Sequence, residues 1–308
     1  MKIAIIGTGG VGGYFGGKLA YSGNDVTFLA RGQHLKAIQE KGLTVKSIHG
    51  DFVVTPAKAT DQIKNIGTVD LIILGLKAWQ VKDIALELPQ IMHDTTIVLP
   101  LQNGVLAAEE LKECMPPKYV LGGLCRIISK IDAPGVINHI EVSPTIVFGE
   151  LDNAKTERVT ILKQLFDQAG FNSRIADDID AELWRKFIFI CVSGLMAITK
   201  SSYGQVMELK ETRQLMTELM NEIFSLSQKM GIKLEPDYVE KTVEYAAKLD
   251  YNASTSLARD VWEGKPSEIE YQNGTVVRLA EKYGVATPIN RFIYECILPM
   301  EKRARKNK

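Results

Sequence analysis

The sequence lacks an excess of charge of either sign, because 37 Lys and Arg residues balance 37 Asp and Glu residues and leave a formal net charge of +0. A chain without net charge carries no global attraction for nucleic acid or for an anionic membrane surface. The sequence also lacks any apolar stretch near the roughly 20 residues that a membrane-spanning helix needs. We therefore expect neither a nucleic-acid partner nor a membrane-bound protein.

Cysteine is scarce as well. The cysteines are Cys114, Cys125, Cys191 and Cys296. No two of them are close enough in the sequence to form a C-x-x-C or zinc-ligand pattern, so we expect no bound metal. The first apolar run, residues 3–6, is too short for a signal peptide and leads straight into glycines. Reduced thiols and the lack of a targeting segment favour a cytoplasmic protein.

What the sequence does contain is a change of pattern about halfway along its 308 residues, a length that suits two domains. In the first half, short apolar runs alternate with helical segments. The clearest apolar runs are residues 2–6, 25–30, 71–76 and 96–101. Strands that alternate with helices favour a parallel sheet with helices on both faces, which is an α/β fold.

Further strand-like segments follow in the same half. Residues 43–48 and 51–55 flank His49-Gly50 and predict a hairpin. Additional β-like runs occupy residues 120–129, 136–141, 145–148 and 171–175, the last of them after an expected helix at 155–169. We expect the first three of these runs to extend the parallel sheet, with Ser143-Pro144 separating two of them, and residues 171–175 to form the last strand.

In the second half, strand-like runs nearly vanish. Helices are expected at residues 179–199, 208–230, 236–249, 254–262 and 268–283. Pro236 suits a first helical position, and Ser267 with Glu270 matches a capping box. The sequence therefore predicts a Rossmann-type dinucleotide-binding domain at residues 1–177 and an all-α domain at residues 178–308.

A glycine-rich turn directly after the first predicted strand carries the cofactor motif. Its residues are Gly7, Thr8, Gly9, Gly10, Val11 and Gly12, which form the pattern G-x-G-x-x-G. The first glycine allows a tight turn, the second lets the backbone approach a pyrophosphate, and the third lets helix and strand pack closely. The following helix N-terminus offers free N–H groups to the phosphates. Because a strand precedes the motif and a helix follows it, we predict a dinucleotide site.

The end of the second predicted strand indicates which dinucleotide binds. Sites that prefer NAD place Asp or Glu near this position to bind the ribose 2′-hydroxyl, whereas this chain has Arg31. A guanidinium favours the additional 2′-phosphate through bidentate, charge-assisted hydrogen bonds. We therefore predict NADPH/NADP as the cofactor, and the alternative is that Arg31 starts a solvated loop.

Two more polar residues follow predicted strands. Lys77 comes just after the run at 71–76, and Asn103 comes just after the run at 96–101. Ligands of open α/β sheets bind beyond the carboxyl ends of the strands, so both side chains are candidates for the site. A loop lysine and an Asn-Gly turn would serve as structural alternatives.

Lys186 is the candidate proton donor of the helical half. It stands at the edge of a nearly all-apolar run, residues 187–196. Burial lowers the pKa of an ammonium and suits it to protonate a developing alkoxide. The alternatives are that Lys186 lays its stem over the core, or that Arg185 takes the role from another face. Ser256 and Glu268 are further candidates, although a carboxylate is also common near a helix start.

In the order and spacing of these segments, the chain resembles the ketopantoate reductase (2-dehydropantoate 2-reductase) family over essentially its full length. The matching segments are residues 7–13, 76–80, 102–104, 183–186, 256–260 and 267–274. The resemblance implies that NADPH reduces a small 2-keto acid, ketopantoate, to pantoate in the pathway to pantothenate and coenzyme A.

The resemblance also implies roles for single residues. Lys186 matches the lysine that holds the keto oxygen and donates the proton, and Glu268 matches the glutamate that assists it. Glu268 would also contact substrate and cofactor, as would Asn103. Ser256 matches the serine that helps to hold the substrate carboxylate, and Lys77 matches a residue that lines the cofactor site.

Two positions depart from the family's pattern. Members often carry asparagines one and two helical turns after the lysine, where this chain has Ile190 and Gly194. Neither residue can make the side-chain hydrogen bonds, and Ser193 points about 100° away on an ideal helix. A missing polar partner weakens the preference for a hydroxylated substrate, so a paralogous reductase of another 2-keto acid is an alternative.

Other functions are also open at this point. A relative could act in the oxidative direction on a 2-hydroxy acid. A non-catalytic NADP(H)-binding sensor is a further alternative, but the joint presence of Lys186 and Glu268 argues against it. The long amphipathic segments of the helical half would also suit a homodimer.

Overall fold

The computed structural model describes residues 1–306 and divides the chain into two compact units. Unit 1 comprises Met1–Gln102 and Leu106–Ile179, and unit 2 comprises Asn103–Val105 and the chain from Asp180 onward. Unit 1 mixes strands and helices, whereas the described elements of unit 2 are all helical. The predicted fold class, a Rossmann-type α/β domain followed by an all-α domain, is confirmed.

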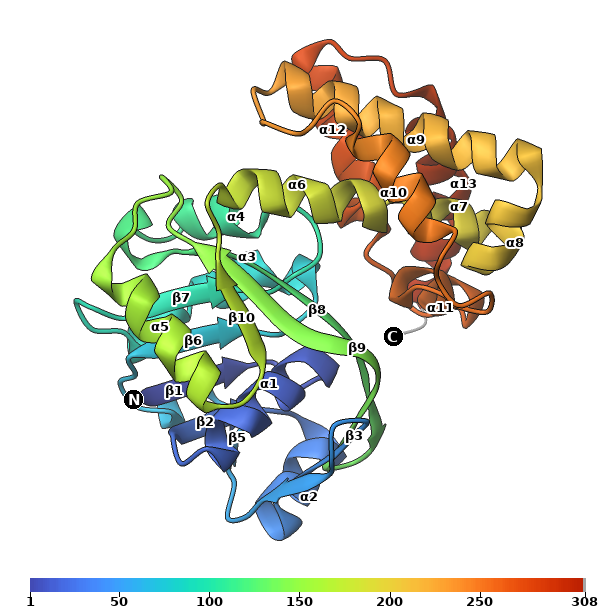
Figure 1. The fold of residues 1–308 in the computed structure, drawn as a ribbon. Coiled ribbons are helices and arrows are strands. Elements are labelled where there is room, and N and C mark those ends of the chain that lie inside the picture. Colours follow the sequence, from blue (N-terminus) through green and yellow to red (C-terminus); the bar gives the residue numbers. More distant parts are fainter. Residues whose placement is uncertain (307–308) are drawn as a thin grey trace. The chain divides into compact units, whose positions relative to one another are not determined.

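The first sheet of unit 1 is entirely parallel. Its strands are β1 (Lys2–Ile6), β2 (Asp25–Leu29), β5 (Lys58–Thr60), β6 (Leu71–Leu74) and β7 (Ile97–Pro100). They lie side by side in the order β5-β2-β1-β6-β7 (Figure 1). Ile5 of β1 packs into one apolar cluster and Ile6 into another, so both faces of the sheet are covered. This explains why β1 is a continuous apolar run without alternation.

The helices of unit 1 lie between strands of the parallel sheet or of the second sheet described below. They are α1 (Gly10–Tyr21), α2 (Gly32–Lys41), α3 (Val81–Ala85), α4 (Ala107–Lys112) and α5 (Glu157–Gln168), together with the 3₁₀ turns η1 (Ile63–Asn65), η2 (Ala78–Gln80), η3 (Leu88–Ile91) and η4 (Pro117–Tyr119). The helix α1 follows β1 directly after the glycine turn, as the motif predicts.

A second sheet in unit 1 corrects one expectation. Its strands are β3 (Leu43–Ser47), β4 (Phe52–Val54), β8 (Gly122–Ala133), β9 (Val136–Gly149) and β10 (Asn172–Ile175). β3 and β4 form the predicted antiparallel hairpin, but they pair through β3 with β9 and not with the parallel sheet. The prediction that the later runs extend the first sheet is therefore wrong.

The second sheet forms because β9 is long and because α1 allows strands to pack closely against it. β9 continues through Ser143-Pro144, with Val142 at a left-handed φ of 66°, instead of splitting there. Its apolar side chains pack on α1: a Cβ added to Gly13 would lie 2.6 Å from Cγ1 of Ile137. The small residues of α1 thus let a second layer of strands approach the helix closely.

Unit 2 is built from helices. They are α6 (Ile179–Ile190), α7 (Val192–Thr199), α8 (Tyr203–Glu208), α9 (Lys210–Lys229), α10 (Tyr238–Ala246), α11 (Ser256–Trp262), the 3₁₀ turn η5 (Ile269–Tyr271), α12 (Asn273–Tyr283) and α13 (Pro288–Lys306). Helix α7 is buried on all sides along Val192–Ala197, whereas α9 carries one buried face. In α9, Met216, Leu219, Met220 and Ile223 are fully buried at helical spacing. Such a stripe is what packs an amphipathic helix into a core.

Several expected helix boundaries in unit 2 are wrong. The helix expected at 179–199 is interrupted at Cys191. Pro236 lies before α10, whose N-cap is Asp237. Ser267 and Glu270 form no capping box, because the Ser267 hydroxyl donates to Glu301 Oε2 at 2.7 Å while Glu270 accepts from Tyr294 and Arg278. The long helix α13 was not predicted at all.

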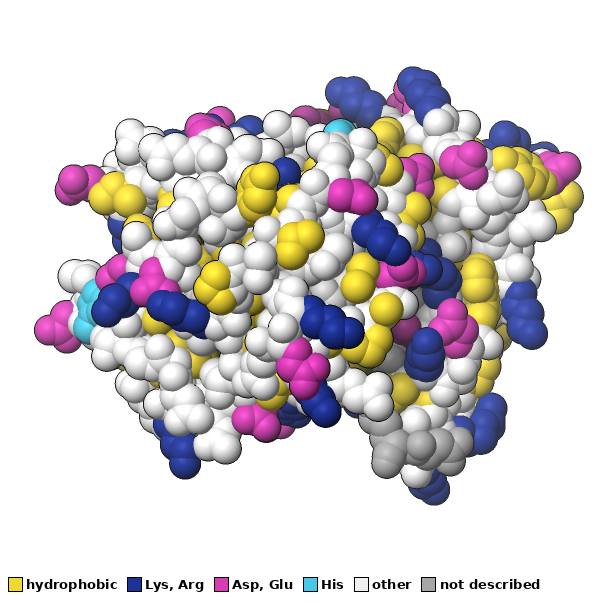
Figure 2. All heavy atoms as spheres, turned by 90° about the horizontal axis from the view of Figure 1, so that it is seen from below, with side chains coloured by type: hydrophobic (Ala, Val, Ile, Leu, Met, Phe, Trp, Pro, Cys, Tyr) yellow, Lys and Arg dark blue, Asp and Glu magenta, His cyan; other side chains and the backbone are white. Residues whose placement is uncertain are grey.

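The described part of the chain has no helix that is both long and apolar enough to cross a membrane. Charged side chains of both signs are interspersed over the face that Figure 2 shows, in keeping with the balanced composition.

Candidate active site

The glycine turn between β1 and α1 has the geometry that its motif requires. Gly7 has a φ of 98°, in the left-handed region that favours glycine. A Cβ added to Gly12 would lie 2.1 Å from the carbonyl oxygen of Gly7, closer than any real contact. A Cβ added to Gly9, in contrast, would meet nothing within 4 Å. The protein therefore packs tightly under the turn and leaves open space beside Gly9.

The donors around this turn fit the pyrophosphate of a dinucleotide. Thr8 is buried, and its hydroxyl donates to the carbonyl oxygen of Leu29 at 2.9 Å, which ties the turn to the end of β2. Gly9 is the N-cap of α1 and provides no side-chain cap. The N–H groups of Gly10 and Val11, in the first turn of α1, have no intrahelical acceptor and suit an anion, whereas the Gly13 N–H donates to the Gly9 carbonyl oxygen at 2.7 Å.

Arg31 and Lys77 follow the two strands that flank β1. Arg31 is exposed and serves as the N-cap of α2, just after β2. Lys77 is half-buried just after β6, and its backbone N–H donates to Gln80 Oε1 at 3.2 Å. Both residues lie at the carboxyl edge of the parallel sheet, which is the edge that carries the glycine turn. This placement agrees with the two residues as candidates for cofactor binding.

Gln102 also contributes to the carboxyl edge of the parallel sheet, a role that the sequence did not predict. Its amide Nε2 donates to the carbonyl oxygens of Leu74 at 2.9 Å and Leu76 at 3.2 Å. The side chain thus ties the end of β7 to the segment that carries Lys77. The signal in the sequence was its position directly before Asn103, at the end of a buried strand.

In unit 2, the structure brings two predicted site residues together. Asn103 Nδ2 donates a hydrogen bond to Glu268 Oε2 at 3.2 Å, across 165 positions of sequence. Glu268 is only 5% exposed. The neighbouring Gly104 has a φ of 101°, and a Cβ there would lie 2.8 Å from the carbonyl oxygen of Tyr271. The Asn-Gly pair thus lets this segment approach the η5 turn closely enough for the amide to reach the carboxylate.

Lys186 and Arg185 are neighbours on α6 with different surroundings. Arg185 donates to Glu182 Oε1 at 3.0 Å and to Glu235 Oε1 at 2.6 Å. Burial acts to lower the pKa of the Arg185 guanidinium, but the hydrogen bond and charge of Glu235 raise the pKa on balance. Arg185 therefore holds α6 to the segment before α10, which disfavours it as the proton donor. Lys186 is half-buried on the same helix.

The interruption of the helix at Cys191 changes how the two family positions are interpreted. Asn273 Nδ2 donates to the carbonyl oxygen of Cys191 at 3.2 Å and to Asn290 Oδ1 at 2.9 Å. A Cβ added to Gly194 would lie 2.5 Å from Asn273 Oδ1. Gly194 therefore faces the interior of unit 2 and has no room for a side chain, whereas Ile190 precedes the break and is half-buried.

Ser256 is the first residue of α11 and is exposed. The N-cap of this helix is Thr255, whose hydroxyl oxygen accepts from the Ala258 N–H at 3.2 Å. The Ser256 hydroxyl is thus not needed to cap the helix, and it has no hydrogen-bond partner among the described residues.

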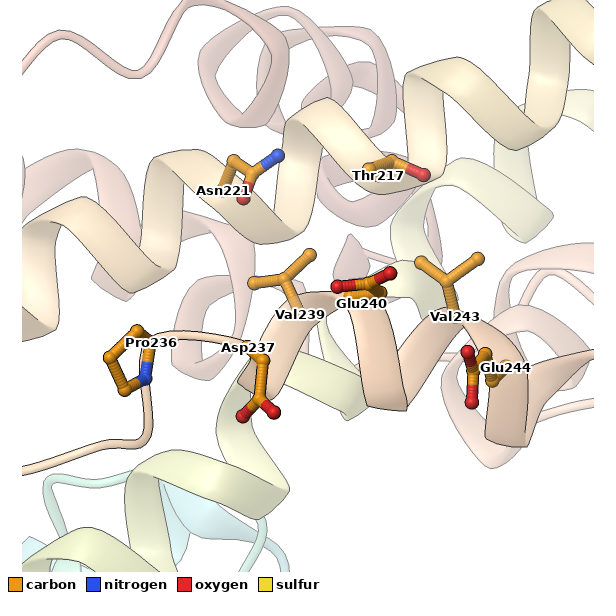
Figure 3. Close-up of a pocket in the computed structure, with 8 residues that line it drawn as sticks. All are labelled: Thr217, Asn221, Pro236, Asp237, Val239, Glu240, Val243 and Glu244. Atoms are coloured by element: carbon orange, nitrogen blue, oxygen red, sulfur yellow. The ribbon is translucent and has the colours of Figure 1, made fainter.

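A groove elsewhere in unit 2 holds none of the predicted site residues. It lies between α9 and α10, has a volume of about 430 Å³, and is drawn in Figure 3. Its lining includes the carboxylates of Asp237, Glu240 and Glu244. Within residues 1–306, no group of three or more His, Cys, Asp and Glu side chains is placed to hold a metal ion.

Comparisons with known proteins cover both units. The family model "Ketopantoate reductase PanE/ApbA" matches residues 3–153, and its C-terminal counterpart matches residues 178–301. A 2-dehydropantoate 2-reductase from Nostoc sp. is 30% identical, over 99% of this chain and 96% of the relative. The crystal structure of a PanE/ApbA family ketopantoate reductase from Ralstonia eutropha JMP134 has a TM-score of 0.91 at 29% identity and covers 99% of this chain and 100% of its own.

A further similar structure is D-mandelate dehydrogenase in complex with NADH, with a TM-score of 0.87 at 25% identity over 98% of this chain and 99% of its own. The family models cover most of both units, and the relatives align along nearly the whole chain. The chain therefore belongs to the ketopantoate reductase (PanE/ApbA) family and is an oxidoreductase that acts on CH–OH groups.

Proposed function

We propose that this protein uses NADPH to reduce 2-dehydropantoate (ketopantoate) to pantoate, a step toward pantothenate and coenzyme A. The observation that carries the proposal is the hydrogen bond from Asn103 to Glu268, which joins two site residues expected from the sequence. The relative from Nostoc sp., named 2-dehydropantoate 2-reductase, supports the choice of substrate.

In this proposal, the residues of unit 2 bind the keto acid and handle the proton. The reduced nicotinamide, when bound, supplies the hydride. The Lys186 ammonium holds the keto oxygen, stabilises the charge that develops on it, and donates a proton to it. Glu268 assists the lysine and contacts the substrate, and Asn103 fixes the position of the Glu268 carboxylate. Ser256 helps to hold the substrate carboxylate.

The residues of unit 1 bind the cofactor in this proposal. The N–H groups after Gly9 bind the pyrophosphate, Lys77 lines the site, and Arg31 binds the 2′-phosphate. The family relationship supports a dinucleotide-dependent reductase, and Arg31 is the residue that favours NADPH over NADH.

Replacing Arg31 with alanine is expected to raise the KM for NADPH about 10- to 100-fold, because charge-assisted hydrogen bonds contribute roughly 1.5–3 kcal/mol. The KM for NADH should change by less than about twofold, since NADH has no 2′-phosphate. The measurement is kcat/KM with both cofactors, with Lys36→Ala as the control because Lys36 is exposed on the same helix. An equal decrease in kcat/KM with NADPH and NADH would show that Arg31 does not bind the 2′-phosphate.

The function itself is tested by following NADPH consumption with ketopantoate, 2-ketoisovalerate and benzoylformate as substrates. Rapid turnover of ketopantoate, with a higher kcat/KM than for the other two acids, is the expected result. If only another acid is turned over, the protein is a reductase but ketopantoate is not its substrate. Tight NADPH binding without turnover of any 2-keto acid would favour the non-catalytic sensor.

A second candidate function is the reduction of a different 2-keto acid, or oxidation of the matching 2-hydroxy acid. It is favoured by Ile190, which is apolar, and by Gly194, which Asn273 and its neighbours leave no room to enlarge. The similarity to D-mandelate dehydrogenase points in the same direction. An apolar side chain at position 190 would suit a substrate with an apolar group better than one with a hydroxyl.

We also propose a cytoplasmic location and a homodimer for the enzyme. The location follows from the proposed metabolic role, and the amphipathic helices of unit 2 would suit a dimer interface. Cell fractionation and analytical ultracentrifugation test the two statements.

A further inference from the structure

Arg259 is a half-buried arginine of unit 2 that the proposed mechanism does not use. It lies on α11, one helical turn after Ser256. Residues three positions apart on a helix are neighbours on its surface, with about 5–6 Å between their Cβ atoms. Any ligand group that reaches the Ser256 hydroxyl is therefore within range of the Arg259 side chain.

The guanidinium is held at the turn that precedes Ser256. Arg259 Nη1 donates to the backbone carbonyl oxygen of Ser254 at 3.0 Å and to the Ser254 hydroxyl oxygen at 3.0 Å. The side chain thus folds back toward the N-terminus of α11, the direction in which helical side chains point. The Nη2 and Nε groups have no hydrogen-bond partner in the described part of the chain, so they can bind a ligand.

The charge of Arg259 is also unbalanced, unlike that of comparable arginines. Arg185 and Arg291 are half-buried too, and each pairs with carboxylates at 2.6 Å. Among residues 1–306, no carboxylate lies within ion-pair distance of Arg259. A half-buried guanidinium without an acidic partner suits an anion that arrives with the ligand.

A chain of contacts connects this turn to the helix of Lys186. Phe189 on α6 stacks on Tyr203, with ring centroids 5.4 Å apart and an interplanar angle of 4°. The Tyr203 N–H donates to the carbonyl oxygen of Ala253 at 3.0 Å, directly before Ser254. The segment that carries Ser254 and Arg259 is therefore linked through Tyr203 to Phe189 of α6, three residues after Lys186.

We propose that Arg259, together with the Ser256 hydroxyl, binds the carboxylate of the 2-keto acid and makes the enzyme selective for acids over neutral ketones. The inference rests on the proposed function, because it assigns a binding group for the substrate of that reaction. Ser256 alone offers one neutral donor, whereas Arg259 adds a positive charge and two donor nitrogens, Nη2 and Nε. Ser254 acts as a positioning residue by holding Nη1.

The test compares a 2-keto acid with its own primary amide, which keeps the reacting carbonyl and removes the charge. The acid is the one of the three assayed above with the highest kcat/KM. Arg259→Gln is expected to raise the KM for the acid about 10- to 100-fold with little change in kcat, and to change the KM for the amide less than twofold. Arg259→Lys retains the charge but loses the paired N–H donors of the guanidinium, so its KM for the acid should lie between those of the unchanged enzyme and Arg259→Gln.

Arg213→Gln is the matched control, because Arg213 is an exposed arginine on α9 and its loss changes the net charge equally. This control should leave both KM values unchanged. Equal losses of acid and amide in Arg259→Gln, or no loss for the acid, would overturn the inference. A loss of the same size in Arg213→Gln would also overturn it.

Calorimetric binding of the three acids to the enzyme–NADP⁺ complex separates the inference from the proposed function. If the enzyme binds an acid without turning it over, and Arg259→Gln weakens that binding, the inference holds while the reductase function fails. Turnover that Arg259→Gln leaves unchanged would overturn the inference alone. An enzyme that neither binds nor reduces any of the acids would overturn both.

Discussion

Replacing Lys186 with alanine is expected to lower kcat about 10²- to 10⁴-fold, the range by which a positioned general acid accelerates a reaction. In the proposed mechanism the ammonium contacts the keto oxygen, where negative charge develops only as the carbonyl is reduced. An interaction that strengthens in the transition state mainly raises kcat, so its loss should lower kcat more than it raises KM. The measurement is steady-state turnover at saturating NADPH with the best 2-keto acid.

The dissociation constant of NADPH, from fluorescence titration, should stay within about twofold of that of the unchanged protein, because Lys186 is not among the residues proposed to bind the cofactor. Lys210→Ala is the control, since Lys210 is exposed at the start of α9 in the same unit as Lys186. Activity that survives in Lys186→Ala would assign the proton to another group. If Lys186→Ala loses NADPH binding or has a markedly lower melting temperature, Lys186 stabilises the fold instead of donating the proton.

Gly9 and Gly12 of the cofactor turn are expected to differ in their effect on stability when each is replaced with alanine, although both replacements weaken NADPH binding. At Gly12 the new methyl group would lie 2.1 Å from the backbone oxygen of Gly7 and 2.9 Å from Cγ2 of Ile5. Neither the buried strand nor the turn can move aside cheaply, so Gly12→Ala should lower the melting temperature markedly and abolish NADPH binding. At Gly9 nothing in the protein lies within 4 Å of the new methyl group.

Gly9→Ala should therefore keep the melting temperature of the free protein within a degree or two. It should still weaken NADPH binding by about tenfold or more, because the methyl group occupies the space that the pyrophosphate needs. Differential scanning fluorimetry without and with NADPH measures both effects in one experiment. Normal NADPH binding by Gly9→Ala would show that the dinucleotide does not bind at this turn. An unchanged melting temperature for Gly12→Ala would show that the turn is not tightly packed against Gly12.

Four strands of the parallel sheet were predictable because they lie in largely apolar runs, and such runs are typical of strands buried on both faces. The edge strand β5 was not, because Lys58–Thr60 is short, largely polar and only partly buried. The second sheet was not predictable, since the apolar end of β9, Ile146–Phe148, resembles those runs and nothing local indicates which sheet it joins. The choice was made by the glycines of α1, including Gly13, which let strands pack on the far side of the helix. Long-range packing of this kind leaves no local signal in β9 itself.

The site was predictable to a similar extent. The positions of Asn103 and Glu268 followed from motif order, and the structure adds the hydrogen bond between them. The crowded surroundings of Gly194 could not be predicted, because Asn273, which lies against it and donates to the carbonyl oxygen of Cys191, comes from a distant part of the sequence. The catalytic and binding roles of all these residues remain predictions for the experiments above.

Asn103–Val105 belongs to unit 2, and this limits how the two units can be separated into fragments. A fragment that starts at Asp180 would contain Lys186, Ser256 and Glu268, but it would lose the amide that donates to the buried Glu268 carboxylate. It would also lose the turn at Gly104 that covers the carbonyl of Tyr271. A separate fragment of unit 2 would therefore lack a hydrogen-bond donor to a buried carboxylate. A fusion of unit 2 to another nucleotide-binding domain must include the Asn-Gly turn.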